Sequence, residues 1–373
     1  MAAGKRVSRI GIMTGGGDCP GLNAVIRVVT RAAIKQLGLD VVGIEDGFLG
    51  LIRNRMRPLT SDDVSNILTV GGTILGTSNK ADPSRFAVSE DKDGKPVFED
   101  VTDRVLEHIA ERGLDAIVCI GGDGTMTGAA RLAQHGVRCI GVPKTIDNDL
   151  MHTELTFGFT TAVQTATECV DRIHSTASSH HRVMLVELMG RNAGWLTLHA
   201  GLAGGADIIL IPEIPYDLEP ICETCIRRSE RGKRFTLIVV AEGAAPKGGS
   251  QVVDKIVHDS PDTIRLGGVS VVLADQIAAH ARRETRATIL GHVQRGGTPV
   301  AFDRVLATRF GYKAVEMIAA EQWNHMVVMQ RGRTDLVPIE SVAGQQRTVP
   351  VDHPLVAMAR AVGTCMGDRC PTA

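Results

Sequence analysis

Two short segments of the chain combine glycines, carboxylates and a lysine in a way that suits phosphate chemistry. GGDGT (121–125) places Asp123 among glycines, and PKTIDND (143–149) carries Asp147 and Asp149. Glycines let a turn expose its backbone N–H groups, and the N-terminus of a following helix adds partial positive charge, so GGDGT suits a phosphate. A carboxylate beside a phosphate is repulsive unless a cation lies between them, so Asp123 indicates Mg²⁺. Together these are the parts of a phosphoryl-transfer site.

Each segment also has a simpler explanation. A glycine-rich turn can merely join a strand to a helix, and a single aspartate in a loop is usually a cap or turn residue. PKTIDND is harder to explain by capping alone, because two aspartates flank one asparagine after a proline and a lysine. Lys144 can hold a phosphate, and one aspartate can accept a hydroxyl proton as a general base.

Basic residues gather at expected turns in the second half of the chain. A solvated charged surface is their usual explanation, and it fits RRSERGKR (227–234). LGHVQRGG (290–297) fits anion binding better, because its histidine and arginine follow an expected buried strand over 287–290. We therefore expect a second phosphate-bearing molecule near some of these residues, which are His181, Arg182, Arg191, Arg286, His292 and Arg295.

The chemistry-bearing segments require a scaffold of alternating strands and helices. Apolar runs rich in Ile and Val are typical of parallel strands buried on both faces. Such runs predict strands over 9–14, 41–44, 115–120, 137–142, 183–188, 207–211 and 235–241. Helical patterns are expected over 22–37, 126–135, 158–174, 218–231, 269–282 and 303–320, with a capped helix start at 61–68. The hydrophilic stretch 91–100 predicts an exposed excursion or hairpin.

The strand–loop–helix alternation occurs on both sides of residue 158. It predicts an α/β protein with two doubly wound, Rossmann-like domains and mostly parallel sheets. We expect one domain over 1–158 plus about 294–344, and the other over 159–293 plus about 345–373. Ligands of such sheets bind beyond the carboxyl ends of the strands, so a cleft between the domains is the expected substrate site.

Composition excludes some classes of function. The chain has 373 residues and a net charge of −1, which argues against nucleic acid as a partner. No apolar run approaches about 18 residues, so no membrane span is expected. The N-terminal MAAGKRVSR lacks an apolar signal core, and we expect a cytoplasmic protein. The eight cysteines are expected to be reduced core residues, and the single CxxC of Cys222 and Cys225 is not enough to indicate zinc.

The motifs resemble those of the phosphofructokinase family, in the family's order and over nearly the whole chain. They are GGGDCPGLNAVIR, GGDGT, PKTIDND, SSHHR, MGRNAGW, RETRATILGHVQRGG and AFDRVLA. The resemblance implies transfer of the terminal phosphoryl group of ATP to the 1-hydroxyl of fructose 6-phosphate, as in glycolysis. It also implies Mg²⁺ as cofactor, a homodimer or homotetramer, a donor domain containing GGDGT and a fructose 6-phosphate domain.

The resemblance further implies roles for individual residues. Asp147 matches the base, Thr145 and Arg191 match residues that hold the transferring group, and Asp123 matches the Mg²⁺-associated carboxylate. Donor contacts fall on Gly17, Lys80, Gly122, Asp123, Gly124, Thr125, Gly128 and Lys144. Sugar-phosphate contacts fall on Thr145, Asp147, Asp149, Arg182, Met189, Gly190, Arg191, Glu242, Arg286, His292 and Arg295. The family's pattern implies that Arg182 and Arg286 reach the site of a neighbouring subunit.

The chain departs from the family's pattern at the donor site. ATP-using relatives usually carry glycine at the positions of Gly124 and Lys144, whereas pyrophosphate users carry aspartate and lysine. We expect ATP, because an aspartate at position 124 would repel the α-phosphate and Lys144 tolerates either donor. A pyrophosphate-dependent enzyme is the alternative. Asn79 stands where many ATP-using members have arginine, and Lys80 is expected to replace its contact.

Two further alternatives belong to other classes. An NAD or lipid kinase would share GGDGT but should lack PKTIDND and GHVQRGG. A non-catalytic regulatory subunit is disfavoured, because Asp123, Asp147 and Arg191 are all present.

The resemblance also bears on regulation. Many bacterial relatives bind phosphoenolpyruvate or ADP in a cationic pocket between subunits. In this chain His174 and Phe235 stand where that pocket has arginine and histidine. Loss of permanent charge there predicts weak coupling to such effectors.

Overall fold

The strand that precedes GGDGT lies in the middle of a large sheet. In the computed structural model, which describes residues 7–257 and 263–370, β6 (Ala116–Gly121) is buried along its whole length. It pairs in parallel with β1 (Arg9–Thr14) on one side and β7 (Cys139–Thr145) on the other. An Ile- and Val-rich strand is stable in this position because both of its faces are covered by helices.

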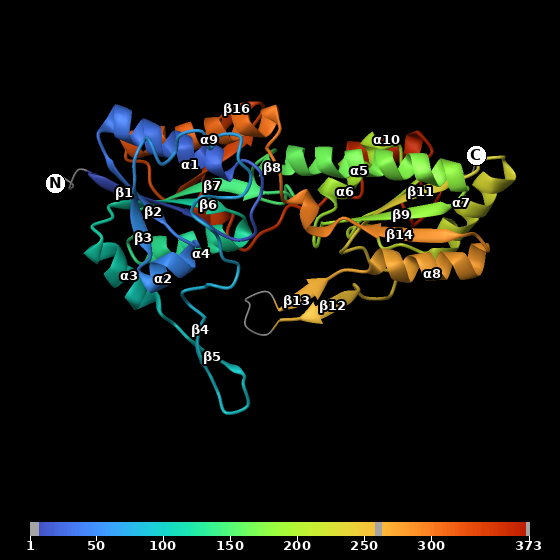
Figure 1. The fold of residues 1–373 in the computed structure, drawn as a ribbon, viewed down its shortest axis with the longest axis horizontal. Coiled ribbons are helices and arrows are strands. Elements are labelled where there is room, and N and C mark those ends of the chain that lie inside the picture. Colours follow the sequence, from blue (N-terminus) through green and yellow to red (C-terminus); the bar gives the residue numbers. More distant parts are fainter. Residues whose placement is uncertain (1–6, 258–262, 371–373) are drawn as a thin grey trace.

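The first sheet has the order β16-β15-β7-β6-β1-β2-β3, with β8 beside β7. The pairs β2–β3 and β15–β16 are antiparallel, and the other pairs along this order are parallel. Helices α1 and α9 cover one face, and α2, α3 and α4 cover the other (Figure 1). The remaining strands are β2 (Asp40–Ile44), β3 (Met56–Leu59), β8 (Phe157–Gly158), β15 (His325–Gln330) and β16 (Arg333–Pro338). The helices are α1 (Leu22–Ala32), which continues as a π-helix over Ala33–Leu37, α2 (Phe48–Arg53), α3 (Thr102–Glu111), α4 (Asp123–Gln134) and α9 (Ala301–Ala319).

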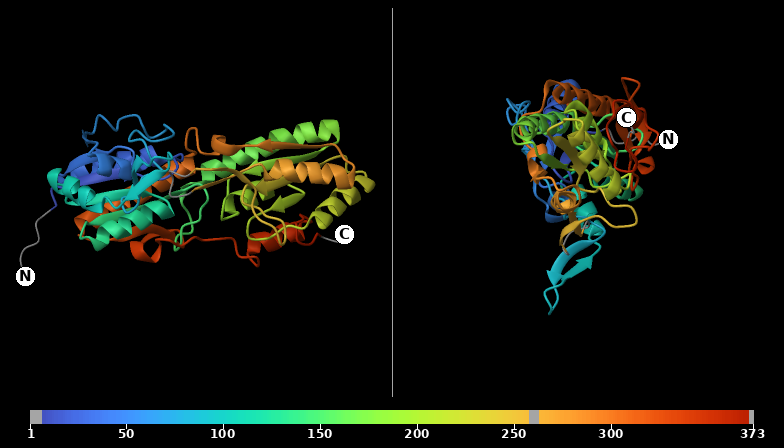
Figure 2. Two further views of the ribbon diagram at one scale, coloured as in Figure 1. Left: turned by 90° about the horizontal axis from the view of Figure 1, so that it is seen from below. Right: turned by 90° about the vertical axis from the view of Figure 1, so that its right-hand side faces the viewer.

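The second sheet is parallel and has the order β10-β11-β9-β14. Its two faces are covered by α5 and α6 on one side and by α7 and α8 on the other (Figures 1 and 2). The strands are β9 (Val183–Leu188), β10 (Ile208–Leu210), β11 (Thr236–Ala241) and β14 (Thr285–Ile289). The helices are α5 (Phe159–His180), α6 (Trp195–Ala203), α7 (Leu218–Glu230), α8 (Val269–Ala281) and the C-terminal α10 (Pro354–Ala361). The predicted α/β fold with two doubly wound sheets is confirmed, while the domain boundaries stay a prediction.

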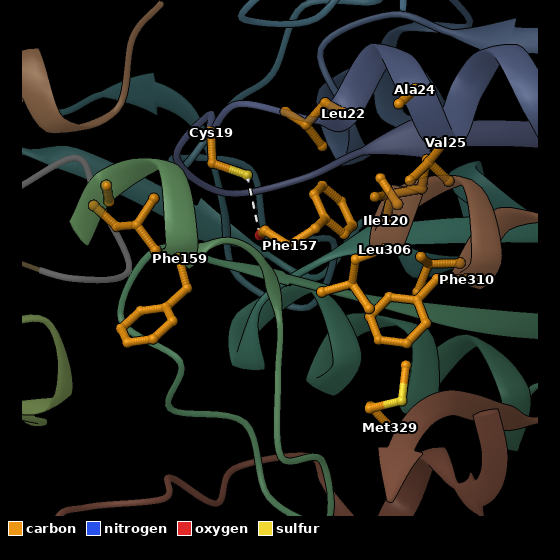
Figure 3. Close-up of a cluster of buried hydrophobic side chains, with 14 of the residues drawn as sticks. Cys19, Leu22, Ala24, Val25, Ile120, Phe157, Phe159, Leu306, Phe310 and Met329 are labelled. Atoms are coloured by element: carbon orange, nitrogen blue, oxygen red, sulfur yellow. Dashed lines mark hydrogen bonds between the residues drawn. The ribbon is translucent and has the colours of Figure 1, made fainter. Parts of the chain in front are cut away.

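The two sheets are joined by closely packed apolar side chains at the start of α5. Phe157 is fully buried, and the Sγ atom of Cys19 lies 3.6 Å from its carbonyl oxygen (Figure 3). Gly158 has a φ of 95°, and a Cβ atom there would lie 2.5 Å from the same sulfur. Glycine is therefore required where the chain passes from one sheet to the other.

Two hairpins extend from the same side of the molecule (Figure 1). One consists of β4 (Phe86–Glu90) and β5 (Pro96–Glu99), and it projects away from the body of the protein (Figure 2). Of the two forms expected for 91–100, an exposed excursion or a hairpin, the structure has the hairpin, and its first strand begins earlier, at Phe86. The other, β12 (Val253–Ile256) with β13 (Ile264–Leu266), lies below the second sheet and was not predicted.

Some expectations about local structure are wrong. The predicted helix over 61–68 is a series of turns, although Thr60 and Asp63 form the expected cap, because the backbone turns left-handed at Asn66 with a φ of 59°. The strand expected to be buried over 287–290 is the sheet-edge strand β14, and Ile289 is 51% exposed. The helix expected over 158–174 extends to His180.

The cysteines follow the expectation in part. Six described cysteines are free, and Cys222 and Cys225 are buried on α7. Cys365 and Cys370 form a disulfide, which corrects the expectation for that pair. Nothing in the spacing of these two residues indicated that the C-terminal chain folds back on itself.

None of the helices in the described ranges is both long and apolar enough to cross a bilayer. Residues 1–6, which carry most of the N-terminal segment considered above, lie outside those ranges.

Candidate active site

The glycine-rich turns after β1 and β6 meet at the N-terminus of α4. The backbone N–H of Gly15 donates to the carbonyl oxygen of Ile120 at 2.9 Å. A Cβ atom at Gly15 or Gly121 would lie 2.5 or 2.1 Å from the side chain of Thr125. Only glycine allows this close approach, which brings the two turns together.

A cavity of about 350 Å³ opens beside these turns. Most of the predicted donor residues line it, namely Gly17, Gly122, Gly124, Thr125, Gly128 and Lys144, together with Thr145 and Arg295. Lys80 and Asp123 are not among the lining residues, whereas Asn79 is. Phe48, Ala81 and Pro83 add an apolar wall that was not predicted. The cavity therefore offers both backbone N–H groups for phosphates and apolar surface beyond them.

Two glycines of this cavity have different roles. A Cβ atom at Gly128 would lie 2.3 Å from the ring of Phe48, so this glycine makes room for the apolar wall. A Cβ atom at Gly124 would meet nothing within 4 Å. The space above Gly124 is therefore open to a ligand.

The loop that carries Asp147 and Asp149 is held by residues on both sides. Asn148 has a φ of 51°, and its side-chain oxygen accepts a hydrogen bond of 3.0 Å from the N–H of Thr156. The guanidinium of Arg347 donates to the carbonyl oxygen of Asn148 at 2.8 Å, and the backbone N–H of Arg347 donates to the carbonyl oxygen of Asp149 at 2.7 Å. Arg347 also stacks over Trp195, with 4.6 Å between the guanidinium carbon and the ring centroid. The two carboxylates thus project from a fixed backbone.

Burial changes the acidity of both carboxyl groups. Desolvation raises the pKa of Asp147, the nearby Arg295 and Lys144 oppose that rise, and Glu242 adds to it. Desolvation and the charge of Asp147 raise the pKa of Asp149 to about 7. The Oδ1 atom of Asp147 is buried and has no hydrogen-bond partner among the described residues. An unsatisfied buried oxygen of this kind is suited to accept a proton from a ligand.

Two cations lie where the two turns approach each other. Lys144 is buried, and its ammonium group donates to the carbonyl oxygen of Gly17. Desolvation lowers the pKa of Lys144. Arg295 packs over Gly17, where a Cβ atom would lie 2.8 Å from its Nη1, and it donates to the carbonyl oxygen of Asp18 at 3.2 Å. Both cations are placed to balance phosphate charge.

Asp123 lies at the first position of α4. Its Oδ1 accepts hydrogen bonds from the N–H of Gly344 at 2.7 Å and from Thr127 at 3.5 Å, and desolvation raises its pKa. Within the described ranges, no group of three or more His, Cys, Asp or Glu residues could hold a metal ion by itself. Mg²⁺ commonly binds through one or two carboxylates together with substrate phosphates, and Asp123 fits that pattern.

A second cavity, of about 730 Å³, lies between the sheets and shares Gly16, Gly17, Asn79 and Arg295 with the first. The predicted acceptor residues Asp147, Met189, Arg191, Glu242 and His292 line it. Asp149 and Gly190 lie in the same loops but do not line it. The cavity also contains residues that were not predicted, which are Gly16, Asp18, Thr77, Asp254, Lys255, Ile264, Arg265 and Leu266.

Arg182 and Arg286 lie at the opposite end of the second sheet. Arg182 immediately precedes β9, and Arg286 is the second residue of β14. Each forms an ion pair with Glu284, at 2.8 Å for Arg182 and 2.7 Å for Arg286. The cavity instead lies beyond the carboxyl ends of these strands, where Met189 and His292 are found. A six-residue strand spans about 20 Å, so these two arginines do not reach the cavity of their own chain.

Comparison with known proteins assigns the family. Residues 9–318 match the family described as Phosphofructokinase. The chain belongs to the phosphofructokinase family. A relative from Clostridium perfringens, named ATP-dependent 6-phosphofructokinase 2, is 51% identical over 97% of this chain and 99% of its own length. A relative from Amycolatopsis methanolica, named pyrophosphate–fructose 6-phosphate 1-phosphotransferase, is 48% identical over 92% of this chain and 97% of its own length.

Solved structures of the family have the same fold. The structure of Pichia pastoris phosphofructokinase in the T-state is 32% identical and has a TM-score of 0.76 over 91% of this chain. The match spans 35% of that longer chain. A pyrophosphate-dependent phosphofructokinase from Marinobacter aquaeolei, at 22% identity and a TM-score of 0.76, shares the fold.

Proposed function

We propose that this chain transfers the terminal phosphoryl group of ATP to the 1-hydroxyl group of fructose 6-phosphate, giving fructose 1,6-bisphosphate and ADP. The proposal is supported by the family and by two cavities that meet at Gly17 and Arg295. Glycine turns and Lys144 line the donor cavity, and Asp147, Arg191 and His292 line the acceptor cavity. Phosphoryl transfer requires such an arrangement, since it depends on positioning and charge stabilisation.

Asp147 is the proposed general base. It takes the proton of the 1-hydroxyl group as that oxygen forms a bond to the terminal phosphorus. The bond from this phosphorus to the bridging oxygen breaks, and ADP leaves. Lys144, Arg191 and Arg295 stabilise the charge that develops on the phosphoryl oxygens.

Mg²⁺ is the proposed cofactor, and Asp123 would hold it. Hydrogen bonds to Asp123 from Gly344 and Thr127 both end on Oδ1, which leaves Oδ2 for the cation. When bound with the donor, the ion neutralises negative charge on the phosphates.

The open space above Gly124 is the observation that favours ATP over pyrophosphate. Gly124 lines the donor cavity, and the apolar wall of Phe48, Ala81 and Pro83 provides surface for a nucleoside. Pyrophosphate is the alternative donor, since a relative named as ATP-dependent is 51% identical to this chain and one named as a pyrophosphate enzyme is 48% identical. A coupled assay of fructose 6-phosphate with ATP or pyrophosphate tests the proposal. We expect a higher kcat/KM with ATP, and activity with pyrophosphate alone would contradict it.

We also propose a homodimer or homotetramer in which Arg182 and Arg286 complete a neighbour's acceptor site. Both arginines lie at the far end of the second sheet from their own cavity. Mixing an inactive Asp147 variant with an inactive Arg286 variant should restore activity in hybrid oligomers. A fully active monomer would refute this arrangement.

A further inference from the structure

The β12–β13 hairpin brings two cations to the acceptor cavity. Lys255 on β12 and Arg265 on β13 are directly opposite each other in the antiparallel pair, and both line the cavity. Residues opposite each other in such a pair place their side chains on the same face of the hairpin, and like charges there are destabilising. An anion bound in the cavity would interact favourably with both cations.

The hairpin is fixed to the site at both of its ends. Gln251, just before β12, donates from Nε2 to the carbonyl oxygens of Arg191 at 3.1 Å and Gly243 at 2.9 Å. Just after β13, the N–H of Gly268 donates to Oε1 of the buried Glu187 at 2.9 Å. These contacts hold the hairpin against the loop that carries Arg191.

Arg265 and Arg191 consequently lie in one cavity as neighbouring like charges. The positive charge of Arg265 contributes to lowering the pKa of Arg191, after desolvation and against the opposing effect of Glu242. Burial raises the pKa of Glu242, so its negative charge is itself disfavoured there. Two adjacent guanidinium groups match the oxygens of a phosphate, which accepts several charge-assisted hydrogen bonds at once.

We propose that Arg265, together with Arg191, binds one phosphate oxyanion of the substrates in the acceptor cavity. Lys255, opposite Arg265, adds positive charge at the same place. The inference rests on the proposed function, because that function defines which phosphates enter the cleft. Two phosphates have the required chemistry, namely the phosphoryl group that is transferred and the 6-phosphate of the sugar.

Equilibrium binding distinguishes these two sources. Fructose 6-phosphate and fructose 1,6-bisphosphate are titrated calorimetrically into wild type, Arg265→Gln and Arg265→Lys. Lys247→Gln is the matched control, because Lys247 is an exposed lysine in the loop before the same hairpin and does not line the cavity. Thermal melting verifies that each variant is folded. If Arg265→Gln does not fold, the two sugars are titrated into Lys255→Gln instead.

We expect Arg265→Gln to lose about ten- to a hundredfold in affinity, the size of a lost charge-assisted contact, with a smaller loss for Arg265→Lys. A loss confined to the bisphosphate assigns the pair to the transferred phosphoryl group. Equal losses for both sugars assign it to the 6-phosphate. Unchanged affinity of Arg265→Gln for both sugars would overturn the inference. A wild-type protein that neither binds nor phosphorylates fructose 6-phosphate would instead refute the proposed function.

Discussion

Substitution of Gly124 by aspartate tests the choice of donor directly. A Cβ atom at this position meets nothing within 4 Å, so the new side chain can enter the donor cavity without displacing the protein. Gly124 is in the first turn of α4, where a negative charge interacts favourably with the helix dipole. We therefore expect Gly124→Asp to fold normally and to melt at the wild-type temperature or slightly above it.

The effect on ATP follows from charge repulsion. Two unit charges about 5 Å apart repel by about 3 kcal/mol at an effective dielectric constant of about 20. Because Gly124 is exposed, solvent screening should reduce this to about 1–2 kcal/mol, or a loss of about five- to thirtyfold in kcat/KM for ATP. Pyrophosphate has no α-phosphate next to a nucleoside, so its use should be affected less.

Steady-state kinetics with each donor, at saturating fructose 6-phosphate, measure this effect. Gly124→Asn is the matched control, because it has nearly the same size and shape as the aspartate variant but no charge. Undiminished use of ATP by Gly124→Asp would refute the reasoning. An equal loss in Gly124→Asn would show that crowding, not charge, discriminates between the donors.

Four other predictions concern the base, its neighbour, the second sheet and regulation. Asp147→Asn should retain affinity for fructose 6-phosphate but lose about 10²–10⁴-fold in kcat, and turnover within tenfold of wild type would exclude it as the base. Asp149 has a pKa of about 7 in the folded protein, above its ordinary value, so its burial costs most stability above pH 7 and less as the pH falls. Asp149→Asn should therefore raise Tm by a few degrees at pH 8 and by less at pH 5, and an equal rise at both would contradict the shift. Glu187→Ala removes the acceptor of three hydrogen bonds at the start of α8 and should cost about 2–5 kcal/mol in urea unfolding, whereas Glu187→Gln should cost less. His174 and Phe235 meet edge to face at 4.8 Å, so we expect phosphoenolpyruvate or ADP to shift half-saturation by fructose 6-phosphate less than about tenfold.

The sequence was sufficient to locate the reacting groups, because they occur in short motifs at the ends of strands. Asp147, Lys144 and Arg295 all line the expected cleft. The local signal was misleading at Thr60 and Asp63, where a cap forms but no helix follows. A cap pattern describes how a helix can begin and contains no information about where the chain leaves it.

The supporting residues were harder to predict, for two different reasons. Arg347 lies in a C-terminal segment without any recognisable motif, and its contacts with the loop of Asn148 depend on the tertiary fold alone. The β12–β13 hairpin has only a weak signal in the sequence, since Ile264, Arg265 and Leu266 alternate apolar and charged residues but Val253 and Ile256 are separated by two charged residues. Alternation over so few residues is easily lost beside the longer strands.

The strand β15 has a consequence for any attempt to shorten this protein. The family match ends at residue 318, yet β15 pairs with β7, the strand that carries Lys144 and Thr145. A chain cut at 318 would lack β15 and β16, so β7, which is buried from Cys139 to Lys144 in the intact protein, would become an unpaired edge strand of the sheet. Such edges associate with other chains, so we expect the truncated protein to aggregate rather than to remain as a smaller folded enzyme. Expression libraries and fragment designs for this chain should therefore keep the segment beyond the family match.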